Sequence, residues 1–148
     1  TVTMHRNNTT LDAAFIATNS GITPTNTLNQ NPPFSSYNTI STTVVSKFSG
    51  QRIAKLGYVT GYTVGGIISA NYSYTDGNGN TYTNLIRANL LVDNGDSGGV
   101  VIETTLTFPN TSYATIGIAR SKGNGSYSGQ ALITKASLIN STFGLSRY

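Results

Sequence analysis

The chain alternates between short runs of apolar and β-branched residues and short clusters of Gly, Asn, Asp or Pro. This pattern is typical of the strands and turns of a β-sandwich or β-barrel. Thr, Ser, Asn and Gly dominate the composition, whereas a helical bundle needs many more strong helix formers. We therefore predict an all-β protein. The expected strands cover residues 13–17, 39–48, 53–59, 63–74, 81–91, 99–107, 114–119 and 130–134.

Three further segments have a clear local signal. Residues 76–80 (DGNGN) separate two extended runs and accept positive φ angles, which predicts a β-hairpin. Residues 20–36 hold three of the four prolines and read as a surface connector, because proline cannot join a central ladder. The one helical signal covers residues 135–140, with Thr134 as the expected N-cap and Gly144 as the expected stop.

Size and charge narrow the possible functions. The 148 residues suit one domain, and the net charge of +4 comes from basic residues that are scattered along the chain. A nucleic-acid binder would gather its basic residues, so we expect no nucleic-acid partner. No stretch of about 18 apolar residues is present, so we expect no membrane span. A composition poor in Lys and rich in Thr, Ser, Asn and Tyr is typical of secreted β proteins, and we predict an extracellular location.

The sequence offers little to a metal or a cofactor. Cysteine is absent, which excludes a disulfide framework and a thiolate metal site. Asp76 and Asp93 lie in loops rich in Asn and Gly, where isolated acids are usually turn residues. We therefore predict no metal and no cofactor.

Residues 95–99 (GDSGG) are the segment that carries chemistry. Glycines on both sides of Ser97 let the backbone bend sharply and leave the hydroxyl uncrowded. Such a bend can direct two backbone N–H groups at one point, as an oxyanion hole requires. Asp96 lies just before the apolar run 100–102, so we expect a buried carboxylate that needs a cation or several donors. The alternative is a tight turn without chemistry.

With this motif the chain resembles the chymotrypsin-type (trypsin-like) serine proteases, especially their small bacterial branch. Residues 57–66 (GYVTGYTVGG) resemble the Gly-x-x-Thr-Gly turn that precedes the active serine in that branch. Residues 117–123 (GIARSKG) resemble the strand that flanks the substrate. The resemblance is good over residues 55–148 and weaker over residues 11–18. It implies a chymotrypsin-like double β-barrel with a short C-terminal helix.

The resemblance assigns roles to residues of the motif. Ser97 resembles the nucleophile, and the N–H groups of Gly95 and Ser97 resemble the oxyanion hole. Asp96 resembles a buried aspartate that pairs with a basic residue on an earlier strand. Lys55 is the expected partner, and Arg52 is close enough in sequence to be the alternative.

The aspartate of the triad has a candidate, but the histidine does not. Asp12 starts a short apolar run that resembles the segment of the triad aspartate, whose role is to orient a histidine. The one histidine, His5, lies seven positions before Asp12, whereas the family places several strands between the two. We expect His5 to be a partly exposed strand residue. The resemblance then implies that the general base comes from a segment missing from this chain.

The same resemblance implies a division into unequal parts. Residues 1–19 would be the end of the first barrel, residues 20–38 the linker and residues 39–148 the complete second barrel. An incomplete first barrel exposes unpaired strand edges and apolar surface. We therefore expect a partner, either an N-terminal fragment that carries the histidine or a swapped copy of the chain itself.

Specificity is less well marked. Leu91, six residues before Ser97, falls where the family has the base of the primary specificity pocket. An apolar base disfavours Lys or Arg, because a buried substrate cation would find no partner. Arg120, Ser121 and Lys122 fall near the expected pocket wall, where basic groups favour an acidic or polar substrate side chain. The alternative is that these charges are solvated on a loop.

These observations favour a serine endopeptidase that hydrolyses polypeptides through an acyl-enzyme at Ser97. Two alternatives stay open. One is a catalytically inactive, protease-like binding module, because removing the general base costs most of the rate. The other is a secreted β-sandwich adhesin in which the GDSGG motif is a coincidental turn.

Overall fold

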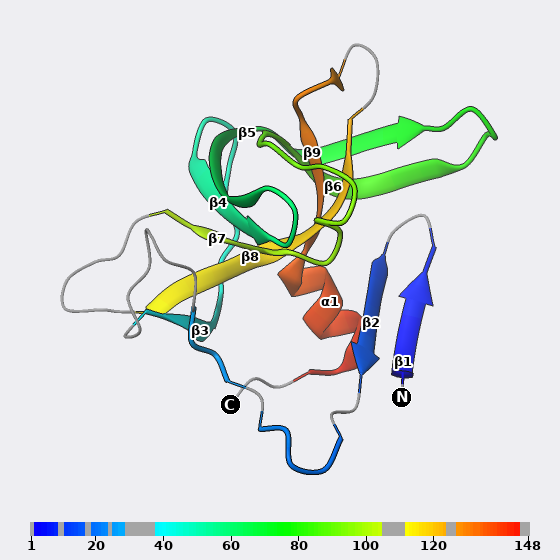
Figure 1. The fold of residues 1–148 in the computed structure, drawn as a ribbon. Helices are drawn as coiled ribbons and strands as arrows, with labels where there is room; N and C mark the ends of the chain where they lie inside the picture. Colours follow the sequence, from blue (N-terminus) through cyan, green and yellow to red (C-terminus); the bar gives the residue numbers. More distant parts are fainter. Residues whose placement is uncertain are drawn as a thin grey trace.

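The computed structural model describes residues 2–8, 11–16, 19–23, 25–28, 38–104, 112–123 and 127–145. They form a two-stranded sheet, a seven-stranded sheet and one helix (Figure 1). The elements in chain order are β1 (Val2–Asn7), β2 (Asp12–Ile16), β3 (Thr39–Val44), β4 (Arg52–Gly57), β5 (Gly61–Thr75), β6 (Thr81–Asn89), β7 (Val100–Glu103), β8 (Ser112–Lys122), β9 (Ala131–Lys135) and α1 (Ala136–Phe143).

Six strands of the larger sheet close into an antiparallel barrel in the order β4-β5-β6-β9-β8-β7, because β8 pairs with β9 as well as with β7, and β7 pairs with β4. Strand β3 runs parallel to β8 and extends the sheet outside this ring. Closure pairs the strand edges that an open sheet would expose. The prediction of an all-β barrel protein is confirmed.

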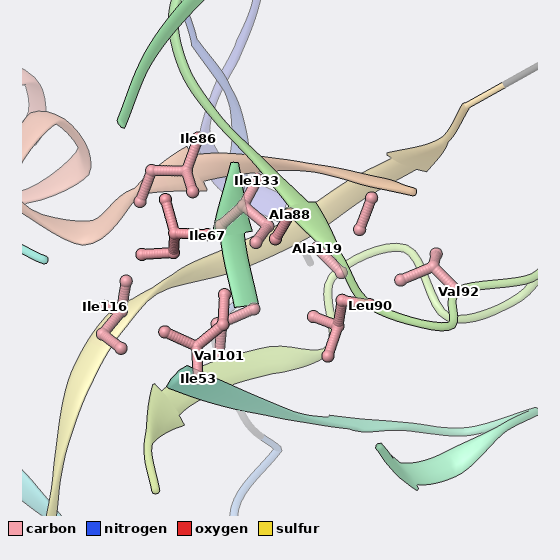
Figure 2. Packing of buried hydrophobic residues seen from close by; sticks show 11 residues of the cluster. Ile53, Ile67, Ile86, Ala88, Leu90, Val92, Val101, Ile116, Ala119 and Ile133 are labelled. Carbon is pink, nitrogen blue, oxygen red and sulfur yellow. The ribbon is translucent and has the colours of Figure 1, made fainter. Parts of the chain in front are cut away.

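The barrel interior is filled by apolar side chains that alternate with outward-facing ones along the strands. Figure 2 shows this cluster. Ile53 on β4, Val101 on β7 and Ile133 on β9 have no exposed surface, and Ile116 on β8 is 1% exposed. Each such side chain contributes roughly 1.5–3 kcal/mol relative to its exposed state. The β-branched residues of the predicted strands therefore supply the core.

The predicted strands correspond to β2–β9, with ends that shift by a few residues. The tail of the run 99–107 beyond residue 104 lies outside the described residues, as does most of the predicted connector 20–36. Strand β1 contains His5, the residue expected to lie in a strand, although no bounds were predicted for this polar segment. Within the described part of the chain, no helix is long and apolar enough to cross a membrane.

The predicted hairpin and helix are both present. The Asp76 carboxylate accepts hydrogen bonds from the N–H groups of Asn78 and Asn80, both at 2.9 Å, and closes the turn between β5 and β6. This hairpin extends away from the barrel (Figure 1). Gly144 ends α1 at φ 62°, as predicted. The N-cap prediction is wrong: Thr134 continues strand β9, and Lys135 is the N-cap without a capping side chain.

Strands β5 and β6 approach each other closely at Gly65. A Cβ at this position would overlap the carbonyl oxygen of Asn89, whereas a Cβ at the neighbouring Gly66 would meet nothing within 4 Å. We expect Gly65→Ala to lower the free energy of unfolding by about 3 kcal/mol, the upper end of overpacking costs. Gly66→Ala should change it by less than about 1 kcal/mol. Urea denaturation of both variants tests this, and equal losses would contradict it.

Candidate active site

The GDSGG segment forms a turn between β6 and β7. Gly95 and Gly98 have φ angles of 99° and 87°, a region that L-residues with a side chain rarely adopt. The Gly98 N–H donates to the Ala119 carbonyl, which fixes the turn to β8. The Ser97 side chain lies at the surface, and its hydroxyl donates to the Arg120 carbonyl at 3.0 Å. The turn thus presents a serine hydroxyl beside the C-terminal end of β8.

Asp96, which precedes Ser97 in the chain, points into the protein: it is 1% exposed and has five donors around its carboxylate. Lys55 Nζ lies 2.9 Å from Oδ2, and the side chain of Lys55 is fully buried. The Thr60 hydroxyl donates to Oδ2 at 2.6 Å, and the Asp93 N–H donates to it at 3.0 Å. The N–H groups of Val59 and Thr60 donate to Oδ1 at 2.8 and 3.0 Å. Both charges of this pair are compensated in the interior.

These donors keep Asp96 ionised. Burial by itself would raise the pKa of this carboxyl, but hydrogen bonds from Thr60, the Asp93 N–H and Lys55 outweigh it and hold the pKa far below the usual range. Arg52, the alternative partner, starts β4 with an exposed side chain. Of the two basic candidates, the structure brings Lys55 to Asp96.

The Gly-x-x-Thr-Gly turn has a structural role that the sequence did not assign to its threonine. Thr60 bonds Asp96 with both its hydroxyl and its N–H, and its hydroxyl also contacts Lys55 Nζ. A Cβ on Gly57 would overlap the Asp96 carboxylate and lie 2.8 Å from Lys55 Nζ. The spacing Gly-x-x-Thr-Gly was the sequence signal from which this role could have been found. Its first glycine, Gly57, leaves room for the ion pair, and Thr60 adds two hydrogen bonds to Asp96.

Two backbone donors beside the serine are unused. Within the described part of the chain, the N–H groups of Gly95 and Ser97 have no hydrogen-bond partner. A Cβ on Gly95 would lie 2.6 Å from Cγ2 of Val59, so glycine also fits this position sterically. Exposed, unpaired N–H groups are available to an acceptor atom of a ligand.

The basic residues at the end of β8 point in different directions. The guanidinium of Arg120 lies over the Tyr82 ring at 4.8 Å, and its Nη2 donates to the Asn8 carbonyl at 3.2 Å. Lys122 Nζ lies 2.6 Å from Asp93 Oδ1, and its hydrogen bond and charge lower the pKa of that carboxyl. Arg120 therefore ties β8 to the N-terminal hairpin, whereas Lys122 ties it to the GDSGG turn.

Of the four residues predicted to form the specificity pocket, two line a pocket in the structure. Ser121 and Lys122 line a pocket of about 600 Å³, which Arg120 does not line. The side chain of Leu91 is 58% exposed and lines neither this pocket nor the smaller one near the start of α1. Its carbonyl instead accepts a hydrogen bond from Thr63 at 3.0 Å.

The N-terminal hairpin carries the remaining candidates. Asp12 starts β2 opposite Asn7, and His5 lies in β1 opposite Ala14. The described structure gives the backbone of these two candidates and leaves their side chains undescribed. The hydrogen bond between Arg120 and Asn8 places this end of the hairpin against β8, the strand that Ser97 also contacts. Among the described residues, no group of three or more His, Cys, Asp or Glu could hold a metal ion.

The sequence matches no family model and no curated protein. The structure matches Thermobifida fusca protease A with a TM-score of 0.68 and 27% identity, over 91% of this chain and 67% of that one. A Nocardiopsis protease matches with a TM-score of 0.69 and 25% identity, over 90% and 65% of the two chains. A Cellulomonas bogoriensis chymotrypsin matches with a TM-score of 0.69 and 23% identity, over 93% and 69%.

The chain has the chymotrypsin-like fold. The similarity to small bacterial chymotrypsin-like serine proteases that the motifs indicated is confirmed by the structure, over about nine-tenths of the chain. The chain in turn spans 65–69% of the length of these three neighbours.

Proposed function

We propose that this protein is a serine endopeptidase in which Ser97 is the nucleophile and the N–H groups of Gly95 and Ser97 form the oxyanion hole. One observation carries the proposal. The exposed hydroxyl of Ser97 lies in a turn, and the preceding residue, Asp96, is fixed by a buried ion pair with Lys55. Two unpaired backbone N–H groups lie beside the Ser97 hydroxyl. The chymotrypsin-like fold supports the same reaction class.

The proposed reaction follows from these groups. Ser97 Oγ attacks the carbonyl carbon of the peptide bond while its proton passes to a histidine. The two N–H groups donate to the oxygen that becomes negative in the tetrahedral intermediate. The histidine then protonates the departing amine, which leaves an acyl ester on Ser97. A water molecule, deprotonated by the same histidine, hydrolyses the ester and restores the hydroxyl.

The Lys55–Asp96 pair would contribute to this reaction by holding the oxyanion donors in position. Asp96 precedes the nucleophile in the chain, and its five hydrogen bonds fix the backbone from which the oxyanion donors project. Donors that are already oriented do not need to reorganise as charge develops. Asp96 is thus a positioning residue in this proposal.

We further propose that Asp12 orients the histidine and that this histidine is supplied by a first-barrel segment outside the printed sequence. Such a segment would be an N-terminal fragment of the same protein or the corresponding segment of a swapped, full-length copy. The contact between Asn8 and Arg120 supports the role of Asp12, because it holds that end of the hairpin beside the strand that Ser97 contacts. The division into residues 1–19, 20–38 and 39–148, and a secreted bacterial origin, belong to the same proposal.

A fluorophosphonate probe tests the proposed function. The natural, full-length protein should react at its serine nucleophile, and mass spectrometry should place the added mass on the peptide that contains Ser97. The protein should be folded, as judged by circular dichroism, and a commercial chymotrypsin should be labelled in parallel. Absence of labelling under these conditions would reject the endopeptidase and favour a binding module.

A further inference from the structure

The 600 Å³ pocket beside the candidate nucleophile has a lining of unusual character. It lies between the β5–β6 hairpin, the end of β8 and the start of β9, and its lining includes Tyr72, Arg87, Ser121, Tyr127 and Gln130. A pocket of this size holds a side chain or a small ligand. Its lining combines aromatic rings with a cation and polar groups, which suits a polar, negatively charged occupant better than an apolar one.

The pocket is close to Ser97. Ser121 and Lys122 line it, and they directly follow Arg120, whose carbonyl accepts the Ser97 hydrogen bond. Two residues of an extended strand span roughly 7 Å, so the rim of the pocket lies within about two substrate residues of that carbonyl. A peptide held at Ser97 can therefore place a neighbouring side chain in the pocket.

Two cations line this pocket, and Arg87 is the one that does not pair with an acid, since Lys122 pairs with Asp93. The guanidinium carbon of Arg87 lies 4.5 Å from the centre of the Tyr72 ring and 5.3 Å from that of Tyr127. Its Nε is buried, and no hydrogen-bond partner for it exists in the described part of the chain. Arginine stays ionised in proteins, so this half-buried guanidinium carries a charge and has one N–H group that has lost water without gaining an acceptor.

The protein's own acids do not neutralise Arg87. Each acidic side chain that the structure describes is engaged elsewhere, in the contacts Asp76–Tyr82, Asp93–Lys122, Asp96–Lys55 and Glu103–Lys47. Gln130 adds a second buried polar group without a partner in the described residues, its Oε1. Rotation of that amide by 180° would turn its NH₂ group toward an acceptor.

We propose that this pocket binds a carboxylate of the substrate, with Arg87 as the specificity-determining residue. The inference rests on the proposed function, because it makes the pocket a subsite of the Ser97 protease. A carboxylate in the pocket would pair with the guanidinium of Arg87 and neutralise its charge. The Tyr72 and Tyr127 rings hold the guanidinium in place, so little conformational entropy is lost on binding.

Direct binding separates this inference from catalysis. Amidated tetrapeptides that carry one Glu, or Gln at the same position, are titrated into the full chain and followed by ¹⁵N NMR. The Glu peptide should bind at least about ten-fold more tightly, the usual effect of one hydrogen bond to a charged group. Its shifts should include the Arg87 side chain. A neutral peptide with a free C-terminus distinguishes a terminal carboxylate from a side-chain carboxylate as the natural ligand.

Variants of Arg87 provide the second readout. Arg87→Gln should remove the preference for Glu over Gln, and Arg87→Lys should retain part of it. Arg52→Gln removes the same charge from the exposed start of β4 and should leave the preference unchanged. Equal binding of the Glu and Gln peptides by the folded wild-type chain would overturn the inference even if Ser97 is labelled. Failure of labelling with an intact Glu preference would instead reject the protease alone.

Discussion

Ser97→Ala is expected to abolish fluorophosphonate labelling and to lower kcat/KM for peptide hydrolysis by about 10⁴-fold or more. The reason is that the acyl-enzyme route needs an oxygen nucleophile at this position, and no step of the proposed reaction bypasses it. The measurement is labelling and peptide hydrolysis by the natural, full-length protein and by its variant. The effect should fall on the chemical step, because the oxyanion donors and the pocket stay in place.

Two controls separate chemistry from folding. Ser141→Ala removes a serine of α1 whose hydroxyl donates to a backbone carbonyl, as Ser97 does, and should leave labelling unchanged. Ser97→Ala should change the free energy of unfolding by less than about 1.5 kcal/mol, since one surface hydrogen bond is lost. Labelling that persists in Ser97→Ala would show that another residue reacts, and the proposed nucleophile would be wrong.

The barrel strands were predictable because their signal is local. Alternation of apolar and polar residues fixes which side of each strand faces the core. The choice of Lys55 over Arg52 does not follow from alternation, because both faces of β4 are buried: Lys55 shares a face with Ile53, and Arg52 shares the other with Ala54. What separates the two candidates is position along the strand, since Arg52 starts β4 and is exposed, whereas Lys55 lies at its buried centre.

The pocket that Arg87 lines could not be predicted from the sequence by such a local rule. Arg87 lies inside the apolar run 85–88 and looks like a core-strand residue with an anomalous charge. Its neighbours Tyr72 and Tyr127 come from the adjacent strand and from a connection 40 residues further along the chain. Only strand register and loop placement bring these groups together. For Leu91 the position relative to Ser97 is fixed by sequence, but the direction of its side chain is not.

Lys55→Met is expected to lower the free energy of unfolding by about 3–5 kcal/mol at pH 7, because it leaves a buried, unpaired carboxylate. The four remaining hydrogen bonds to Asp96 do not supply a counter-charge. Lys47→Met is the matched control. Lys47 pairs with Glu103 at 3.3 Å near the surface, where losing a pair costs at most about 1 kcal/mol. Similar losses in the two variants, measured by urea denaturation, would contradict the structural role of the buried pair.

The pH dependence of the same variant identifies Asp96 as the cause. The pKa of Asp96 is lowered in the folded wild-type protein, so its contribution to stability is present above the unfolded value of about 4 and is lost as pH falls toward the folded value. Lys55→Met removes one of the hydrogen bonds that lower this pKa, so the pKa of Asp96 is higher than in the wild type, and protonation of Asp96 relieves the unpaired charge as pH falls. The stability difference between wild type and Lys55→Met should therefore be largest at pH 7 and shrink toward pH 4. A difference that is constant over this range would mean that Lys55 acts through packing of its side chain and not through the charge of Asp96.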